Sequence, residues 1–269
     1  MILPYSGLEL PLALAIFDID GVVRDVAQSY RRAIADTVEH FTSGKFRPGM
    51  EDIDQLKTEG IWNNDWKASE ELIFRFYERQ GESREAFGDR YSDIVDFFQQ
   101  KYRGDDFSGY IQNEPLLMTP EYLQSLSKGK IAWGFFSGAT QGSADFVLRR
   151  RLSIQEPVLV AMEDAPGKPN PEGLFLTIHK LGTGHPAESW QNVPVLYVGD
   201  TVADIQTALN ARQQDSHRHF AGVGIIPPHA KGSVTYADRL SQAGAVKVFD
   251  SVTDLTPDAV KDILAKGQS

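Results

Sequence analysis

The sequence predicts an α/β protein with a doubly wound parallel sheet and an inserted all-helical domain. From about residue 113 onward, short apolar runs alternate with segments of helical periodicity, which is typical of a parallel sheet covered by helices on both faces. Between residues 24 and 110, strand-like alternation is almost absent. We therefore expect an α/β core formed by residues 1–23 and 111–269, and a helical cap domain formed by residues 24–110. The two crossings between them are expected to act as hinges.

The expected strands are short apolar runs bounded by turn residues, which is the pattern of buried parallel strands. The first run, residues 12–17, ends abruptly at Asp18. Several later runs also end at a polar residue or a glycine, so the strand ends carry groups that can bind or react. The later expected strands are residues 131–136, 158–162, 195–198, 221–226 and 245–249.

Helix boundaries follow from capping residues and from the 3.6-residue period of apolar side chains. In the helical domain we expect Ser69 to cap a helix whose first turn carries acids, and we expect residues 43–54 to form a loop. In the core, Thr119-Pro120 and Gly129 mark the two ends of one helix. The expected helices are residues 26–41, 69–77, 91–103, 119–129, 141–151, 170–182, 202–210 and a terminal helix that begins at Thr256.

The composition limits the classes of partner. The chain has 269 residues, a formal net charge of −10 and a pI near 5.1, which argues against nucleic acid or an anionic membrane as a partner. It contains no cysteine, which excludes disulfides, thiolate catalysis and cysteine-ligated zinc. It shows neither a signal-peptide pattern nor an apolar run approaching the ~18 residues of a spanning helix. We therefore expect a cytoplasmic protein, in which an anionic ligand would need a metal ion or a local cation.

Two carboxylates follow the first strand at a spacing that suits a phosphoryl-sized group. Asp18 ends the apolar run, and Asp20 follows two residues later, before Gly21. In an extended chain such carboxylates lie roughly 6–7 Å apart, which is too far to share one proton easily. An acid at the carboxyl end of a strand lies where open α/β sheets bind their ligands. Taken alone, the stretch also fits an Asx-type turn at the end of a strand.

Three later junctions between strands and helices carry groups that can bind phosphate or metal. Ser137-Gly138 offers a hydroxyl and backbone N–H groups ahead of a helix, which favours an anion. Lys168 stands at a helix entrance in G-K-P-N-P and supplies a compact cation. Asp200 and Asp204 can hold a hard cation such as Mg²⁺, which prefers oxygen ligands. Each feature alone has an ordinary structural explanation, but a doubly wound sheet would gather all of them at one edge.

Four segments, F-D-I-D-G-V-V, S-G-A, G-K-P-N-P and V-G-D-T-x-x-D, together resemble the motifs of the haloacid dehalogenase-like hydrolase superfamily. The resemblance covers the core on both sides of the insertion. The inserted helices resemble the small cap of subfamily I, which includes phosphoglycolate phosphatase and β-phosphoglucomutase-like members. The resemblance implies that Asp18 attacks phosphorus and forms an aspartyl-phosphate, and that Asp20 protonates the leaving alcohol and then activates water. Dehalogenating members have no acid at the position of Asp20, so an acid there points to an oxygen leaving group.

The same resemblance implies the remaining site residues and a cofactor. Ser137, Gly138 and Lys168 would bind the oxygens of the phosphoryl group. The cofactor would be Mg²⁺, which neutralises charge as one anion attacks another. The implied metal site comprises Asp18, the backbone carbonyl of Asp20, Asp200 and, in a supporting place, Asp204.

Substrate specificity is expected to lie in the helical domain. Its most polar and least periodic stretch contains Asn63, Asn64 and Lys67, and we hypothesise that these residues face the active site and read the substrate. Arg24 stands where an apolar residue is common in the resembling family, and it places a further candidate substrate contact near the first crossing. The sequence identifies the substrate only as a small phosphorylated metabolite.

The sequence leaves four functions open. The leading interpretation is a Mg²⁺-dependent phosphatase for a small phosphorylated metabolite. A phosphomutase acting on a sugar phosphate would use the same residues, and the motifs do not separate the two. The non-enzymatic alternatives are a receiver-like signalling domain, which is expected to lack the helical insertion, and a binding protein that has kept the scaffold. The oligomeric state is equally open.

Overall fold

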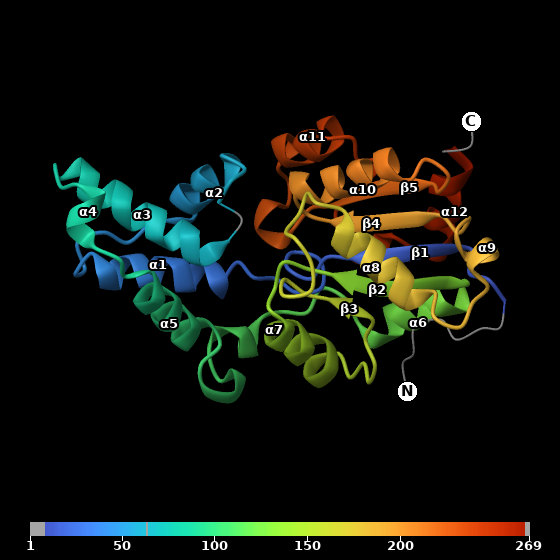
Figure 1. The fold of residues 1–269 in the computed structure, drawn as a ribbon, viewed down its shortest axis with the longest axis horizontal. Coiled ribbons are helices and arrows are strands. Elements are labelled where there is room, and N and C mark those ends of the chain that lie inside the picture. The colour runs from blue at the N-terminus through green and yellow to red at the C-terminus, as the bar shows by residue number, and fades with distance from the viewer. Residues whose placement is uncertain (1–8, 63, 267–269) are drawn as a thin grey trace. The chain divides into compact units, whose positions relative to one another are not determined.

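The chain folds into two compact units, an α/β unit and a helical unit (Figure 1). The computed structural model describes residues 9–62 and 64–266. Within these ranges, no helix combines the length and the apolar character needed to cross a membrane. The sequence places the boundaries of the insertion after residues 23 and 110. The contacts divide the chain into an α/β unit of Met1–Asp25 with Pro115–Ser269 and a helical unit of Val26–Glu114.

Six parallel strands form the sheet of the α/β unit, in the order β3-β2-β1-β4-β5-β6. The chain starts at β1 inside the sheet, builds outward to one side, and then crosses to build the other side. This doubly wound arrangement confirms the predicted fold class. The strands are β1 (Ala13–Phe17), β2 (Ile131–Phe136), β3 (Leu159–Val160), β4 (Val195–Gly199), β5 (Phe220–Ile225) and β6 (Lys247–Phe249).

Helices follow the strands and pack on the sheet (Figure 1). The side chain of Thr119 accepts a hydrogen bond from the backbone N–H of Tyr122 at the start of α6, as expected for a capping residue. α6 packs on β2, α8 packs on β2 and β3, and α10 packs on β4 and β5. The helices of this unit are α6 (Pro120–Lys128), α7 (Gln141–Asp145), α8 (Glu172–Leu181), α9 (Ala187–Trp190), α10 (Val202–Gln214), α11 (Val234–Gln242) and α12 (Pro257–Lys266).

Both faces of the sheet are buried, which explains why its central strands are almost entirely apolar. On one face, Ile16 of β1 joins a cluster with Leu174 of α8 and Ala208 of α10. On the other face, the ring of Phe17 packs edge-to-face on Tyr122 of α6, with centroids 6.4 Å apart. The helices therefore hold β1 from both sides and fix the position of its carboxyl end.

Several elements of the α/β unit differ from the expectation. The helix expected over residues 141–151 changes after α7 into a π-helical turn, Phe146–Arg151, in which hydrogen bonds reach five residues instead of four. β3 is shorter than the expected strand 158–162, and it is an edge strand that pairs with β2 alone. α11 was not expected from the sequence, since Leu240 is its one buried residue and its apolar period is therefore weak.

The described part of the helical unit is built from α1 to α5, with α1 packed against both α3 and α5. Its core consists of apolar side chains at helical spacing, such as Ile34, Ile73 and Phe98. The segment 43–54 was expected to be a loop, but α2 begins within it. The helices are α1 (Tyr30–Phe41), α2 (Met50–Thr58), α3 (Asp65–Arg79), α4 (Arg84–Phe87) and α5 (Tyr91–Tyr102).

The start of α3 corrects another expectation. Asn64 caps this helix in place of Ser69, because its side-chain oxygen accepts hydrogen bonds from the backbone N–H groups of Trp66 and Lys67 at 3.0 and 3.1 Å. Ser69 is buried one turn further along, and its hydroxyl donates to the backbone carbonyl of Asp65. Both residue types can cap a helix, and the polar sequence around Asn64 hides where the helical period starts.

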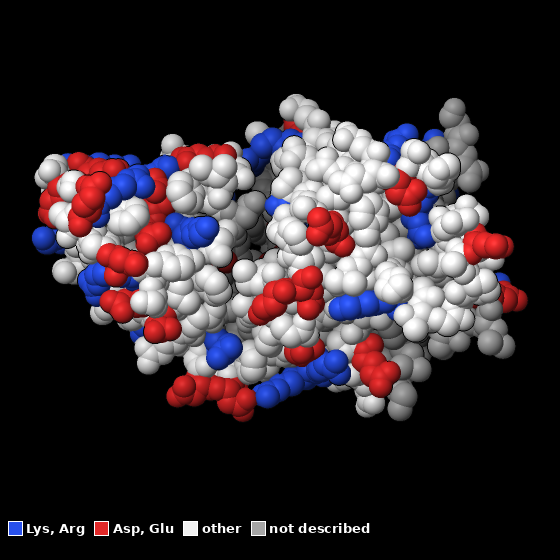
Figure 2. Space-filling view, in the orientation of Figure 1, with Lys and Arg blue, Asp and Glu red and all other residues white. Residues whose placement is uncertain are grey.

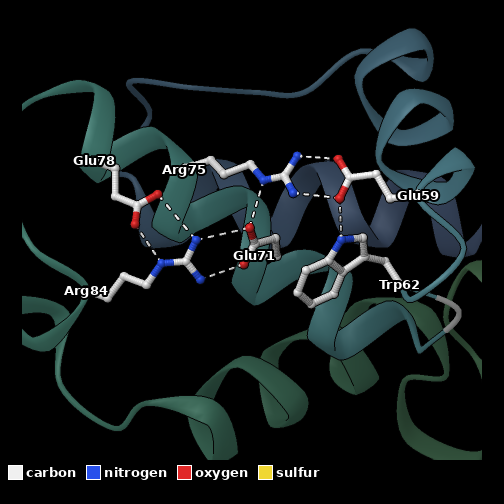
Figure 3. A network of polar contacts seen from close by, with 6 residues as sticks. All are labelled: Glu59, Trp62, Glu71, Arg75, Glu78 and Arg84. Atoms are coloured by element: carbon white, nitrogen blue, oxygen red, sulfur yellow. Dashed lines mark hydrogen bonds and ion pairs between the residues drawn. The ribbon is translucent and has the colours of Figure 1, made fainter.

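A network of ion pairs joins the end of α2 to α3 and α4 (Figure 3). Glu71 is buried at its centre and accepts hydrogen bonds from Arg75 at 2.7 Å and from Arg84 at 2.8 Å. Arg75 also donates to both carboxylate oxygens of Glu59. The network therefore fixes the segment that follows α2 against α3. Its members are Glu59, Trp62, Glu71, Arg75, Glu78 and Arg84.

Charged side chains of both signs lie intermixed over the helical unit in the view of Figure 2. The face of the α/β unit that carries α8 is mostly uncharged in the same view. Among the described residues on this face there is no basic stripe of the kind that follows a nucleic-acid backbone.

Candidate active site

Three polar residues follow neighbouring strands of the sheet at their carboxyl ends. Asp18 follows β1, Ser137 follows β2 and Asp200 follows β4. β2 and β4 pair with β1 on its two sides, and both pairs are parallel, so the three strand ends lie along one edge. After β1 the chain builds β2 and β3 on one side, and it then returns to build β4, β5 and β6 on the other side. Doubly wound sheets bind ligands at the point where the strand order reverses in this way.

Lys168, in the loop between β3 and α8, lies between two of the acids. Its ammonium is 2.8 Å from Oδ1 of Asp18 and 2.6 Å from Oδ1 of Asp204. The Lys168 side chain is only 11% exposed. A buried ammonium needs such partners because leaving it unpaired away from water is costly. The two ion pairs therefore hold a cation beside Asp18.

Two aromatic rings also contact this lysine. Its ammonium lies 5.7 Å from the ring centroid of Phe136 and 5.5 Å from that of Tyr197, within the range of a cation–π interaction. The hydroxyl of Tyr197 donates to the backbone carbonyl of Phe136 at 3.0 Å and lies 3.3 Å from Oδ1 of Asp204. Residues of β2 and β4 thus orient the lysine, although the lysine itself comes from a loop.

Asp204 holds Lys168 and the start of α10 together. Its Oδ2 accepts hydrogen bonds from the backbone N–H and the hydroxyl of Thr201, at 2.9 and 2.6 Å. Its own backbone N–H donates back to the Thr201 hydroxyl at 3.2 Å, which completes a capping box. Because its Oδ1 faces Lys168 and Tyr197, both carboxylate oxygens are engaged within the protein. Asp204 is therefore placed to support the cluster through Lys168 and Thr201.

Burial and crowded charge shift the pKa values in this cluster. Burial raises the pKa of Asp18 to about 6, and Lys168 opposes this shift. The negative charges of Asp204 and Asp20 add to it. Burial, followed by the charges of Asp204 and Asp18, raises the pKa of Asp200 well above its usual value. Burial lowers the pKa of Lys168, but Asp18 and Asp204 outweigh this effect and raise it above its usual value.

The acids form a group that could hold a metal ion. Asp18, Asp200 and Asp204 each place one carboxylate oxygen within 4.8 Å of the others. Their mutual repulsion contributes to the raised pKa values of Asp18 and Asp200, and a divalent cation would relieve it. An all-oxygen donor set suits Mg²⁺. Since the oxygens of Asp204 are already engaged, Asp18 and Asp200 are the side chains that fit direct binding.

Two glycines allow the acids to approach the backbone closely. A Cβ atom at Gly21 would lie 2.2 Å from Oδ2 of Asp200, and the φ of Gly21 is +77°, in the region that favours glycine. A Cβ atom at Gly199 would lie 2.2 Å from the Cβ of Asp204. Any side chain at these two positions would displace an acid of the cluster.

The turn after β2 is held by its own hydrogen bonds. Ser137 is buried, and its hydroxyl oxygen accepts a hydrogen bond from the backbone N–H of Ala139 at 3.1 Å. Gly138 is exposed, and Thr140 caps α7 through the backbone N–H of Ser143. The structure thus brings Ser137 and Gly138 to the edge that carries Asp18. Their contact with a phosphoryl group stays a prediction.

Arg24 contacts an acid of the first motif. It is fully buried, and its Nε and Nη2 atoms each lie 2.7 Å from Oδ1 of Asp20. The Asp20 side chain is 32% exposed, whereas that of Arg24 is 1% exposed. Direct contact with a substrate, the role expected for Arg24 from the sequence, does not fit so buried a guanidinium.

The other candidate substrate residues lie in the helical unit. The side-chain oxygen of Asn64 is engaged as the cap of α3, and Lys67 is exposed in the first turn of that helix. Asn63 lies outside the described residues. The role of these three residues in reading a substrate stays a prediction.

Sequence reasoning missed three residues that support the cluster. Tyr197 contacts Asp204, Thr201 forms the capping box, and the hydroxyl of Tyr236 donates to the backbone carbonyl of Asp200 at 2.9 Å. The spacing T-x-x-D from Thr201 to Asp204 is a capping-box pattern that could have been found. The tyrosines gave no comparable signal, because their contacts depend on how β4 and α11 pack.

Acids, a hydroxyl and a lysine thus gather at the carboxyl edge of a doubly wound sheet, the edge at which such sheets bind ligands. The sequence matches the family described as "Hydrolase: haloacid dehalogenase-like hydrolase" over residues 12–212. The chain therefore belongs to the haloacid dehalogenase-like hydrolase family, and the resemblance of its four motifs to that family is confirmed.

One curated relative is similar over much of the chain. It is named "Imidazoleglycerol-phosphate dehydratase", from Phytophthora nicotianae, and is 30% identical over 198 residues. The match covers 72% of this chain but only 40% of the relative. The chain therefore spans less than half the length of that relative, whose name describes the longer protein.

Solved structures with a similar fold cover most of the chain. Phosphatase Tt82 from Thermococcus thioreducens is 24% identical with a TM-score of 0.58, covering 78% of this chain and 92% of that chain. A phosphonoacetaldehyde hydrolase-like protein from Oleispira antarctica is 17% identical with a TM-score of 0.66, covering 97% of this chain and 94% of that chain. At these identities the likeness shows a shared fold.

Proposed function

We propose that this protein is a Mg²⁺-dependent phosphatase that hydrolyses a phosphate monoester of a small metabolite through an aspartyl-phosphate. The observation that carries the proposal is the placement of Lys168 between Asp18 and Asp204, in one cluster with Asp200. A carboxylate that attacks a phosphate ester is one anion approaching another, so it needs a fixed cation beside it. Phosphoryl transfer depends mainly on such positioning and charge neutralisation.

In the first step, a carboxylate oxygen of Asp18 forms a bond to phosphorus while the bond from phosphorus to the ester oxygen breaks. The electron pair stays on the departing oxygen, and Asp20 gives that oxygen a proton so that it leaves as an alcohol. Lys168 offsets negative charge between Asp18 and the phosphoryl group. The hydroxyl of Ser137 and the N–H of Gly138 are candidates to bind phosphoryl oxygens.

In the second step, Asp20 takes a proton from water, and the water oxygen attacks phosphorus. The bond between phosphorus and Asp18 breaks, which releases inorganic phosphate and restores the carboxylate. Mg²⁺ held by Asp18 and Asp200 would supply neutralisation of charge on the phosphoryl oxygens. Covalent capture divides one slow displacement into two easier ones.

The name of the curated relative suggests a first compound to test. It contains imidazoleglycerol phosphate, a small phosphate ester, and that compound belongs in the first panel beside sugar phosphates and phosphoglycolate. Because the chain spans only 40% of the relative, we do not extend the dehydratase activity to it.

A panel of phosphorylated metabolites, assayed for released inorganic phosphate, tests the proposal. We expect release from at least one ester with Mg²⁺, and loss of that release with EDTA. D18N should lower turnover by at least ~1,000-fold, the scale of losing a nucleophile. D258N serves as the matched control, because Asp258 is an exposed acid of the same unit that pairs with Lys261, and this variant should keep its turnover.

Other outcomes would contradict parts of the proposal. Isomerised sugar phosphate without phosphate release would show a phosphomutase. Binding of phosphate esters without turnover of any of them would show a binding protein on this scaffold. Full turnover by D18N would exclude Asp18 as the nucleophile.

A further inference from the structure

We infer that Arg24 is a positioning residue for the proposed reaction. It holds the carboxylate of Asp20 by one oxygen, so that the proton exchanged with the substrate is carried by the other oxygen. The inference rests on the proposed function, in which Asp20 is the acid and then the base. Arg24 itself would touch neither the substrate nor the reacting atoms.

The guanidinium of Arg24 approaches a single oxygen of Asp20. Its Nε and Nη2 both lie 2.7 Å from Oδ1. The common bidentate pair uses both carboxylate oxygens, and the network around Glu71 shows that arrangement with Arg84. Both 2.7 Å contacts of the guanidinium fall on Oδ1, and no hydrogen bond among the described residues reaches Oδ2. A proton on Asp20 therefore belongs on Oδ2, since Oδ1 already faces two N–H groups.

The backbone holds both partners in place. The N–H of Gly21 donates to the carbonyl of Arg24 at 2.9 Å, and the N–H of Arg24 donates to the carbonyl of Ile19 at 3.2 Å. The N–H of Leu117 donates to the carbonyl of Val23 at 2.8 Å, so the chain just before Arg24 is also anchored. The arginine therefore cannot drift with its partner and acts as a fixed point for the carboxylate.

The exposures of the two side chains agree with this role. Arg24 is 1% exposed, and Asp20 is 32% exposed at the edge that carries Asp18. A planar guanidinium with two nitrogens on one oxygen restricts rotation of the carboxylate more than a single contact would. Oδ2 is thus left as the atom that gives its proton to the ester oxygen and later takes one from water.

The test uses a series of phosphate esters that differ in leaving group. Departure of an alkyl alcohol needs a proton, whereas p-nitrophenol leaves readily without one. kcat/KM reports the steps up to departure of the alcohol, so it isolates the acid role of Asp20 from its later role as base. We expect R24M to lower kcat/KM by about 30- to 300-fold for alkyl phosphates, because a mispositioned acid loses part of the roughly 100- to 10,000-fold that general acid catalysis supplies. For p-nitrophenyl phosphate the loss should be at most about 3-fold.

A double-mutant cycle tests whether Arg24 acts through Asp20. With alkyl phosphates, D20A should already remove the acid, so D20A/R24M should be no slower than D20A. A further large loss in the double variant would overturn the inference. So would an equal loss for all leaving groups in R24M, or a faster R24M enzyme, which would show that Arg24 restrains Asp20 in an unproductive position.

Two controls separate positioning from folding. R218M removes another buried arginine of the same unit, which donates to the carbonyls of Trp190 and Val193. Any decrease in kcat/KM that R218M causes should be the same for all leaving groups. R24K keeps the charge but loses the planar guanidinium, so its kcat/KM for alkyl phosphates should lie between those of wild type and R24M. R24K also provides the test if R24M does not fold. Wild-type protein that turns over no phosphate ester would overturn the proposed function itself. Active wild type with no leaving-group effect in the Arg24 variants would overturn this inference alone.

Discussion

Asp18 occupies a place that is unfavourable for its own charge. Its carboxylate is buried near other acids, and burial is the main reason that its pKa rises from 3.8 to about 6. Folding therefore opposes ionisation of this residue, although attack on phosphorus requires the ionised form. Stability and function pull in opposite directions here, as is common at active sites.

D18N should consequently stabilise the metal-free protein in a pH-dependent way. A pKa raised on folding gives stability that is complete below 3.8 and is lost as the pH rises through about 6. The gain from D18N should thus grow from pH 4 toward pH 7, to at most about 3 kcal/mol for a shift of this size. Urea unfolding of both proteins in EDTA measures it. A gain in stability that shrinks with rising pH would contradict a raised pKa of Asp18 in the folded protein.

The four motifs taken together predicted which residues gather at this edge of the sheet, whereas the residues that support them were not predicted. Asp18 and Asp200 directly follow strands and Lys168 precedes a helix, each in a short motif, so the set of motifs can be read from the sequence. Tyr197 supports the cluster through Phe136, which lies on another strand. Arg24 was identified as unusual, but only the fold shows that its guanidinium lies on Asp20.

At the scale of elements, the helical unit depends on Glu71 as a hub between helices. Its side chain is 5% exposed and pairs with Arg75 and Arg84, which are 33% and 43% exposed. Removing one partner of a buried ion pair leaves the others without their counter-charge. Solvent screens the two arginines in part, so the loss is smaller than for a fully buried triad.

E71A should therefore lower the free energy of unfolding of the helical unit by about 1–3 kcal/mol. E78A is the matched control, since Glu78 pairs with the same Arg84 but is 43% exposed, and it should change stability little. Urea unfolding followed by circular dichroism measures both. Equal effects of the two substitutions would show that burial of Glu71 does not set the strength of the network.

The elements themselves were predicted unevenly, for physical reasons. Strands buried on both faces appear as apolar runs, and β2 matches its expected range of 131–136. The start of α3 was misplaced because Asn64 and Ser69 are both able to cap a helix. α11 was not predicted because it buries little apolar surface, so its sequence has no clear helical period of apolar residues.

For the whole molecule, the order of elements predicted the doubly wound sheet. Alternation of strands and helices requires parallel strands with crossovers, and such crossovers allow few arrangements. The strand order β3-β2-β1-β4-β5-β6 itself came only from the structure. The division into two units was readable because the segment from Val26 to Glu114 contains apolar periods of helices and no strand among its described residues.

The net charge of −10 gives a prediction for the whole chain. A phosphate ester is an anion, so the overall field should slow its approach while Lys168 and a metal ion attract it locally. Screening by salt should weaken the long-range repulsion first. At fixed saturating Mg²⁺, kcat/KM for the best substrate should rise between about 10 and 150 mM NaCl. A steep fall over that range would indicate that local attraction dominates.

The proposed aspartyl-phosphate can be trapped and located in the sequence. D20A should accept phosphate from p-nitrophenyl phosphate, because that leaving group needs no acid, and then hydrolyse it slowly for lack of a base. Acid quenching followed by borohydride reduction converts an aspartyl-phosphate into homoserine, which peptide mass spectrometry locates. We expect homoserine at position 18 when Mg²⁺ is present, and none with EDTA. Burst release of p-nitrophenol with Asp18 unmodified, or homoserine at another aspartate, would contradict it.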